Sequence, residues 1–155
     1  MYSIDTSALI EGWLRAYPPD TFPTLWEQHI DGLIQSGRLK ASDEVLEEIS
    51  KKDDELRAWC EGRDDFFVEL EDSIQDALIG LMQRYPKLVG AHNGKNAADP
   101  VVISLAISRI PALTVVTQED GGSERKPKIP YICRNEGVRC ITLLDLIREQ
   151  GWTFR

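Results

Sequence analysis

The chain has 155 residues, enough for one domain with its own hydrophobic core, and we expect residues 1–155 to form a single domain. Hydrophobic residues make up 42% and charged residues 28%, proportions that are typical of a soluble globular protein and argue against a disordered chain. The formal net charge is −8, which by itself disfavours nucleic acid as a partner.

The predicted elements alternate between short strands and helices. In the first half we expect a strand at 2–4, helices at 5–18 and 22–37, an extended stretch at 38–41, a helix from 42 through 49 and a short helix around 56–59. In the second half we expect a long helix at 67–85, a loop at 86–96, a helix at 97–110 and a strand at 113–117. A loop at 118–130, a short helix opening at Pro130, a strand at 138–141 and a helix at 143–149 follow. Thr142 and Asp145 are expected to cap the last helix.

Two of these elements indicate the fold class. Residues 113–117 form a β-branched run of the kind that is buried in parallel sheets. Residues 97–110 are apolar on more than one side, which is typical of a central, buried helix. Because strands alternate with helices, we predict an α/β fold in which three layers (αβα) surround a short parallel sheet.

The negative charge is concentrated in one part of the chain. Residues 43–76, hereafter the acidic block, contain fourteen acidic and four basic side chains, whereas the remainder has a small excess of basic ones. Such a block is either the solvated surface of helices or a docking face for a basic partner. Since the remainder is slightly basic, the net charge does not exclude RNA as a substrate.

Several other kinds of protein are disfavoured. No apolar run is long enough to span a bilayer, and the N-terminus lacks the basic start and apolar core of a signal peptide. The three cysteines show no CxxC spacing, which disfavours a disulfide framework or a zinc site. No Walker loop, GxGxxG, GxSxG or HExxH occurs. We therefore expect a cytoplasmic protein that does not contact membranes.

Acidic residues stand where the ends of several predicted elements should meet. Asp5 follows the first strand, Glu119 and Asp120 follow the β-branched run, and Asp99 opens the buried helix. The candidates for a fourth acid, in the segment after the extended stretch, are Glu44, Glu47 and Glu48. Each acid could instead have a structural role, as a helix cap, as a turn residue or on the solvent-exposed side of a helix. Their placement nevertheless favours convergence at the carboxyl ends of the strands.

Carboxylates that share a pocket repel each other and take up protons unless a cation neutralises them. Oxygen ligands without histidine or cysteine clusters select magnesium or manganese. Such a site can activate water and stabilise the leaving group in the cleavage of a phosphodiester bond.

Four motifs, in this order, resemble those of the PIN domain, the nuclease family that includes the VapC toxins of bacterial toxin–antitoxin pairs. They are residues 4–7 (Ile-Asp-Thr-Ser), residues 42–49, in which Glu48 is the best match, residues 98–100 (Ala-Asp-Pro) and residues 115–119 (Val-Val-Thr-Gln-Glu). The last motif has Glu119 where the family usually has aspartate, and Asp120 could take that role instead. Residues 128–147 resemble a bacterial branch of the family.

The resemblance implies a PIN-like fold and a magnesium- or manganese-dependent endoribonuclease with a four-carboxylate catalytic site. Asp5 and Asp99 would bind the main metal ion, Glu119 would be a further ligand, and Glu48 would complete the pocket directly or through water. Ser7 and Thr117 would hydrogen-bond to the ligands and hold their orientation. The family also implies an antitoxin that keeps the enzyme inactive, and a homodimer that the early helices could form.

Basic residues flank two of the acids. They are Lys95, which precedes Asp99 by four residues, and Arg125, Lys126 and Lys128, which follow Glu119. These side chains either contact RNA phosphates beside the metal site or keep the loops soluble.

Two other functions remain open at this point. A PIN-like domain that no longer cleaves could serve as a binding or regulatory module. Another magnesium-dependent phosphoryl-transfer enzyme, such as a phosphatase, is the second alternative. The Asp-x-Asp motif of one large phosphatase class is missing, because Thr6 and Ser7 follow Asp5.

Overall fold

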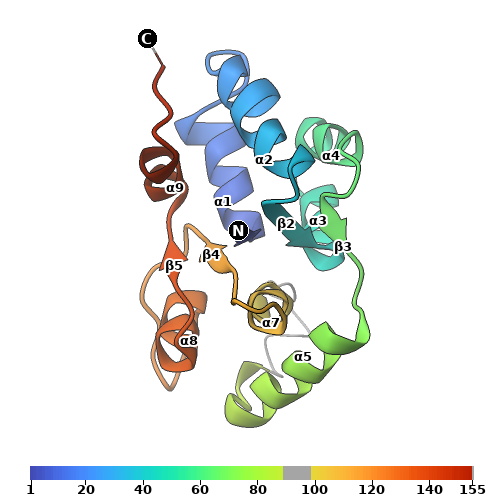
Figure 1. Cartoon of the computed structure of the whole chain (residues 1–155). Coiled ribbons are helices and arrows are strands. Elements are labelled where there is room, and N and C mark those ends of the chain that lie inside the picture. Colours follow the sequence, from blue (N-terminus) through green and yellow to red (C-terminus); the bar gives the residue numbers. More distant parts are fainter. Residues whose placement is uncertain (89–98, 155) are drawn as a thin grey trace.

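The computed structural model describes residues 1–88 and 99–154, and a five-stranded parallel sheet lies at its centre (Figure 1). The strands are β1 (Tyr2–Ile4), β2 (Leu39–Ser42), β3 (Phe67–Val68), β4 (Thr114–Val116) and β5 (Cys140–Ile141). Their order across the sheet is β3-β2-β1-β4-β5, and each neighbouring pair is parallel. The predicted parallel sheet is therefore confirmed.

Helices cover both faces of the sheet and complete the predicted three layers (Figure 1). One layer contains α1 (Thr6–Glu11) with its π-helical continuation η1 (Gly12–Ala16), η2 (Leu25–Ile30), α2 (Asp31–Gln35), α3 (Asp43–Ser50), α4 (Asp54–Glu61) and α9 (Leu143–Gln150). The other contains α5 (Asp72–Arg84), α7 (Asp99–Ser108) and α8 (Ile129–Glu136). Among the described residues, every helix is too short or too polar to traverse a lipid bilayer.

The order of the strands reverses beside β1. The chain adds β2 and β3 on one side of β1 and then returns to add β4 and β5 on the other. The pairing of Ile4 with Val116 brings the carboxyl ends of β1 and β4 to the same level. In open parallel sheets, ligands bind beyond the carboxyl ends of the strands at such a reversal point.

α7 is the central helix of its layer, as its apolar composition predicts. All of its residues from Pro100 to Ala106 are buried, and the helix contacts β1, β2, β4 and α5. The hydroxyl of Ser3 in β1 donates a hydrogen bond of 2.9 Å to the carbonyl of Val102. This bond joins the first turns of α7 to β1 and thereby fixes Asp99 relative to the sheet.

Gly12 allows close packing at the end of α1. A Cβ atom on this residue would lie 2.6 Å from Cδ2 of Leu143 and 3.2 Å from Cζ2 of Trp26. Contacts of 2.6 Å are incompatible with close-packed side chains, so a larger residue would displace the side chain of Leu143 or move α1 away from α9. Because the first turn of α1 follows Asp5, this packing also positions the carboxyl end of β1.

The predicted helix over 67–85 is wrong at its beginning. Phe67 and Val68 form the edge strand β3, paired with Ala41 and Ser42, and α5 begins only at Asp72. The spacing of Phe67 and Leu70 continues the helical period of α5, but Leu70 is 49% exposed and does not belong to its buried face. Period alone cannot distinguish a short edge strand from an extra helical turn.

Other boundaries differ by small amounts. The helix predicted to open at Pro130 begins one residue earlier, at Ile129, and holds the proline in its first turn. The capping of α9 by Thr142 and Asp145 is confirmed as a reciprocal capping box. The described part of the helix predicted at 97–110 is α7, and residues 89–96 of the predicted loop lie outside the described residues.

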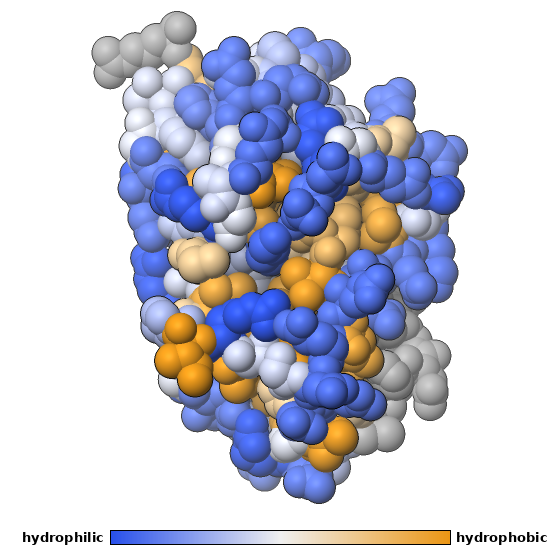
Figure 2. Space-filling model, turned by 45° about the vertical axis from the view of Figure 1, so that its right-hand side comes forward, coloured by the Kyte–Doolittle hydropathy of each residue, from blue (hydrophilic) through white to orange (hydrophobic). Residues whose placement is uncertain are grey.

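The acidic block lies along α3, α4, β3 and the start of α5, on the side of the molecule that Figure 2 brings forward. Hydrophilic residues cover much of this face, and apolar residues emerge in patches among them (Figure 2). Asp54, Glu55, Asp64 and Asp76 are exposed members of the block. Most of this negative charge is therefore solvated.

Candidate metal centre

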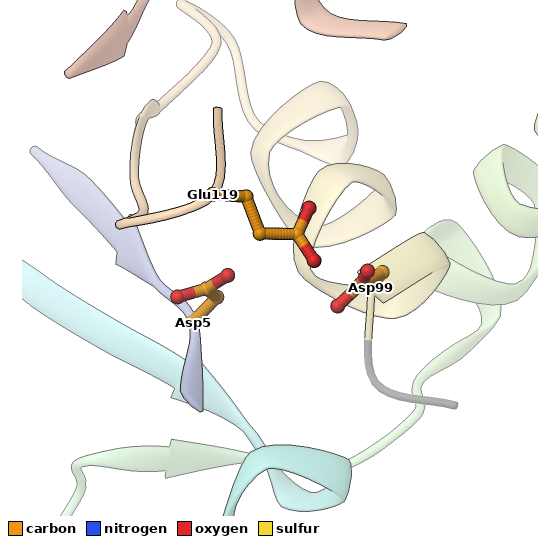
Figure 3. Close-up of side chains that lie close together, drawn as sticks. All are labelled: Asp5, Asp99 and Glu119. Atoms are coloured by element: carbon orange, nitrogen blue, oxygen red, sulfur yellow. The ribbon is translucent and has the colours of Figure 1, made fainter. Parts of the chain in front are cut away.

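Three carboxylates converge at the point where the strand order reverses. Asp5 follows β1, Glu119 follows β4 and Asp99 is the first residue of α7. One carboxylate oxygen from each lies within 4.8 Å of the others, and Figure 3 shows Glu119 between the two aspartates. Residues from three distant parts of the sequence thus face one small volume, as the sequence predicts for Asp5, Asp99 and Glu119.

Three donors hold the carboxylate of Asp5, which is 2% exposed. Ser7 Oγ and the amide of Ala8 donate to Oδ1, at 2.7 and 3.0 Å, and Thr117 Oγ1 donates to Oδ2 at 2.7 Å. The bond from Ala8 makes Asp5 the N-cap of α1. The structural and functional interpretations of Asp5 are therefore compatible. Ser7 and Thr117 occupy the orienting positions that the sequence predicts.

Glu119 is held at both ends. Its amide donates to Thr117 Oγ1 at 3.0 Å, and its Oε2 accepts a bond of 3.1 Å from the amide of Ile129, the first residue of α8. A helix N-terminus favours a carboxylate because its free N–H groups point toward it. These bonds close the loop after β4 and aim the carboxylate toward Asp5 and Asp99.

Burial and the charges of neighbouring acids raise the pKa values of the aspartates in the cluster. Burial raises the pKa of Asp5 to about 6, against the bonds from Ala8, Thr117 and Ser7 that lower it. Burial, followed by the charge of Glu119, raises the pKa of Asp99 to about 9. No Lys or Arg of the described residues forms an ion pair with Asp5, Asp99 or Glu119. Protonation or a bound cation is therefore needed to offset the mutual repulsion of these acids.

Glu48 lies at the margin of the cluster. Thr6, the residue after Asp5, donates a bond of 2.8 Å from Oγ1 to Oε1 of Glu48. Burial raises the pKa of Glu48, and the charge of Glu119 adds to the rise. The sequence prediction did not include Thr6, although its position next to Asp5 in the first turn of α1 is the signal that could have identified it.

The sequence alternatives are not equally placed. Glu48 is bonded to Thr6 and feels the charge of Glu119, whereas no such bond to Glu44 occurs among the described residues and Glu47 is exposed. Asp120 is exposed as well, whereas the neighbouring Glu119 is half-buried and contributes to the cluster. The structure therefore favours Glu48 and Glu119 over these three residues.

Ser42 has a buried hydroxyl without a partner. It stands directly before α3, a position where serine commonly caps a helix, but its side chain makes no capping bond, and Oγ is unpaired among the described residues. Ser42 is the last residue of β2 and Asp5 follows β1, its parallel neighbour, so both residues stand at the carboxyl edge of the sheet. A buried unpaired hydroxyl costs about 1–3 kcal/mol and calls for a water or an ion.

The basic residues predicted to contact RNA are only partly described. Arg125, Lys126 and Lys128 are exposed in the loop that begins at Glu119, and Lys128 directly precedes α8. The amide of Ile129 reaches Glu119, so the end of this loop lies beside the acids. Lys95 lies outside the described residues.

The side chains present fit a hard divalent cation. All the donors are carboxylate or hydroxyl oxygens, as Mg²⁺ and Mn²⁺ prefer. The raised pKa values of Asp5 and Asp99 and the unpaired Ser42 hydroxyl are features that a bound cation with its waters would relieve. Asp5, Asp99 and Glu119 are the residues that could hold it.

Comparison with known proteins gives a family but no activity. A family model described as "Domain of unknown function (DUF4411)" matches residues 2–154, nearly the whole chain. No curated protein matches the chain.

Proposed function

The chain belongs to the DUF4411 family, and we propose that it is a magnesium- or manganese-dependent endoribonuclease. The convergence of Asp5, Asp99 and Glu119 at the reversal point of a parallel sheet is the observation that carries this proposal. The resemblance of four sequence motifs to those of the PIN domain supports the choice of RNA as the substrate and a PIN-like assignment of the fold.

In this proposal Asp5, Asp99 and Glu119 hold the metal ion. When bound, such an ion polarises a phosphate oxygen and lowers the pKa of the attacking water. Glu48 accepts the proton of that water at Oε2, because Thr6 occupies its Oε1. Burial raises the pKa of Glu48, and a higher pKa makes a carboxylate a stronger proton acceptor.

The hydroxyl groups keep the acids in position. Ser7 and Thr117 each donate to a different oxygen of Asp5, so the plane of this carboxylate is fixed before any ligand arrives. The hydroxyl of Thr117 also accepts a hydrogen bond from the amide of Glu119, so this one side chain contacts both Asp5 and Glu119. Such outer contacts commonly change metal affinity about 10- to 100-fold when they are removed.

We further propose that the protein is the toxin of a toxin–antitoxin pair and acts in the cytoplasm, where Cys60, Cys133 and Cys140 would stay reduced. The charge of the acidic block is complementary to a basic antitoxin segment. Arg125, Lys126 and Lys128 would contact RNA phosphates next to the acids.

Incubation of the purified protein with single-stranded RNA of mixed sequence tests the proposed function. We expect cleavage with manganese or magnesium, none with EDTA, and none by Asp5→Asn or Asp99→Asn. Asp76→Asn, which removes an exposed acid of α5, is the matched control and should cleave like the wild type. Equal cleavage by Asp99→Asn and the wild type would refute the assigned site. A wild type that binds manganese without cleaving would favour the regulatory module instead.

A further inference from the structure

A pocket of about 450 Å³ adjoins the acidic cluster on the side of β5. It lies beyond the carboxyl ends of β4 and β5, between α8 and the start of α9. Its lining includes Thr117, Glu119, Arg134, Cys140, Thr142 and Asp145. Pockets that take small ligands have volumes of about 300–1,000 Å³, so this one suits a single nucleotide.

The pocket and the candidate metal centre share two residues. Thr117 hydrogen-bonds to Asp5, and Glu119 belongs to the cluster, yet both also line the pocket. A polymer whose phosphate reached the acids would therefore place its neighbouring residue at the mouth of the pocket.

Arg134 supplies a cation in this acidic neighbourhood. It stands in the last turn of α8, is exposed, and its side chain makes no ion pair or hydrogen bond with any described residue. Arg84 and Arg139, by contrast, are paired with Glu136 and Glu149. A guanidinium group that is free of partners can bind phosphate through two parallel hydrogen bonds.

The other polar groups of the pocket favour a nucleotide over a simple phosphate. The carboxylates of Asp120 and Asp145, the latter through Oδ1 because Oδ2 caps α9, can accept hydrogen bonds but repel phosphate, so they suit the N–H groups of a base or the hydroxyl of a ribose. A whole base can enter such a concave site only when it is unpaired, because the bases of duplex RNA are paired and stacked inside the helix.

We propose that this pocket binds one unpaired nucleotide of the RNA, next to the bond that is cut, and that Arg134 contacts its phosphate. This inference rests on the proposed ribonuclease function and restricts it to single-stranded substrates. Arg134 and the pocket then act on substrate binding, whereas the three acids act on the metal ion.

Fluorescence anisotropy with a labelled single-stranded RNA of about ten nucleotides tests the proposal. The host is Asp99→Asn, in which we expect no cleavage during the measurement. Adding Arg134→Ala should weaken binding about 10-fold or more, since a charged hydrogen bond is lost. Arg134→Lys should restore part of the affinity, and the same RNA as a duplex should bind weakly to both proteins.

Arg38→Ala is the matched control. Arg38 is exposed and precedes β2, at the edge of the sheet opposite the acids, so its loss removes one positive charge but no pocket contact. Equal affinities of the Arg134→Ala and Arg38→Ala proteins would overturn the pocket proposal. So would a duplex that binds as tightly as the single strand.

Two further measurements separate this proposal from the ribonuclease function. In the otherwise wild-type protein, Arg134→Ala should raise KM for cleavage while the manganese-induced rise in Tm stays unchanged. If the wild type neither cleaves RNA nor responds to manganese, the proposed function fails. In that case an Arg134-dependent affinity would still support the pocket as a binding site for single-stranded RNA.

Discussion

Replacement of Asp99 by asparagine should stabilise the metal-free protein and abolish its response to metal. In the folded protein, burial and the charge of Glu119 raise the pKa of Asp99 from 3.8 to about 9. The folded chain therefore binds a proton at neutral pH that the unfolded chain releases. It follows that the free energy of unfolding falls as the pH rises from about 4 to about 9.

The size of the effect follows from the pKa shift. At pH 7.5 the difference between 7.5 and 3.8, at about 1.4 kcal/mol per pKa unit, corresponds to about 5 kcal/mol. Because Asp99 is only half-buried and water reaches it, we expect a gain of about 3 kcal/mol for Asp99→Asn. For a protein of this size, that gain corresponds to a rise in Tm on the order of 10 °C.

Thermal unfolding in EDTA and in manganese, at pH 5 and pH 8, measures these expectations. In EDTA the wild type should lose stability between pH 5 and pH 8, and Asp99→Asn should lose less. Manganese at 100 times its Kd should stabilise the wild type by about 2.7 kcal/mol and leave Asp99→Asn unchanged. Asp76→Asn should match the wild type throughout. An Asp99→Asn protein that is less stable than the wild type in EDTA, or that keeps the manganese response, would refute this reasoning.

Three further expectations concern the surroundings of the acids. Ser42→Ala removes an unpaired buried hydroxyl and should leave the Tm in EDTA equal or higher while reducing the rise in Tm with manganese; an unchanged rise would exclude the hydroxyl from the ion site. Thr117→Val keeps the shape but removes the bond to Asp5, so manganese titration should show about 10-fold weaker affinity; an unchanged affinity would exclude an orienting role. Replacing Arg125, Lys126 and Lys128 together by alanine should weaken RNA binding and flatten its salt dependence by up to about three in slope, and an unchanged slope would remove this loop from the RNA-binding surface.

Local sequence signals are sufficient to predict the frame of the fold. The strands β1 and β2 run directly into helices, β4 is a β-branched run, and the apolar composition of α7 requires burial on all sides. Because parallel strands end at one edge, the acids that follow β1 and β4 could be expected to meet before the structure was known. Phe67 shows the limit, since its pairing with Ala41 is a contact between distant residues that no local period reveals.

The pocket could not be predicted from the sequence, because it too depends on contacts between residues that are distant in the sequence. Arg134 and Asp145 belong to different helices, and only the packing of α8 and α9 around β5 brings them to one cavity with Glu119.

Ser42 illustrates a different limit. Its position before α3 predicts a helix cap, but only the structure shows that its hydroxyl leaves the cap unused.

The presence of glutamate at position 119 has a physical reason in the loop that follows β4. The amide of Glu119 is bound to Thr117, so its backbone stays at the end of the strand. Its carboxylate must nevertheless reach both the N-terminus of α8, where Ile129 donates to it, and the space between Asp5 and Asp99 (Figure 3). Aspartate, shorter by one methylene, would withdraw the carboxylate from one of these two contacts. The longer side chain thus joins the acidic cluster to α8, the helix that also carries Arg134, and makes the candidate metal centre and the adjoining pocket one continuous site.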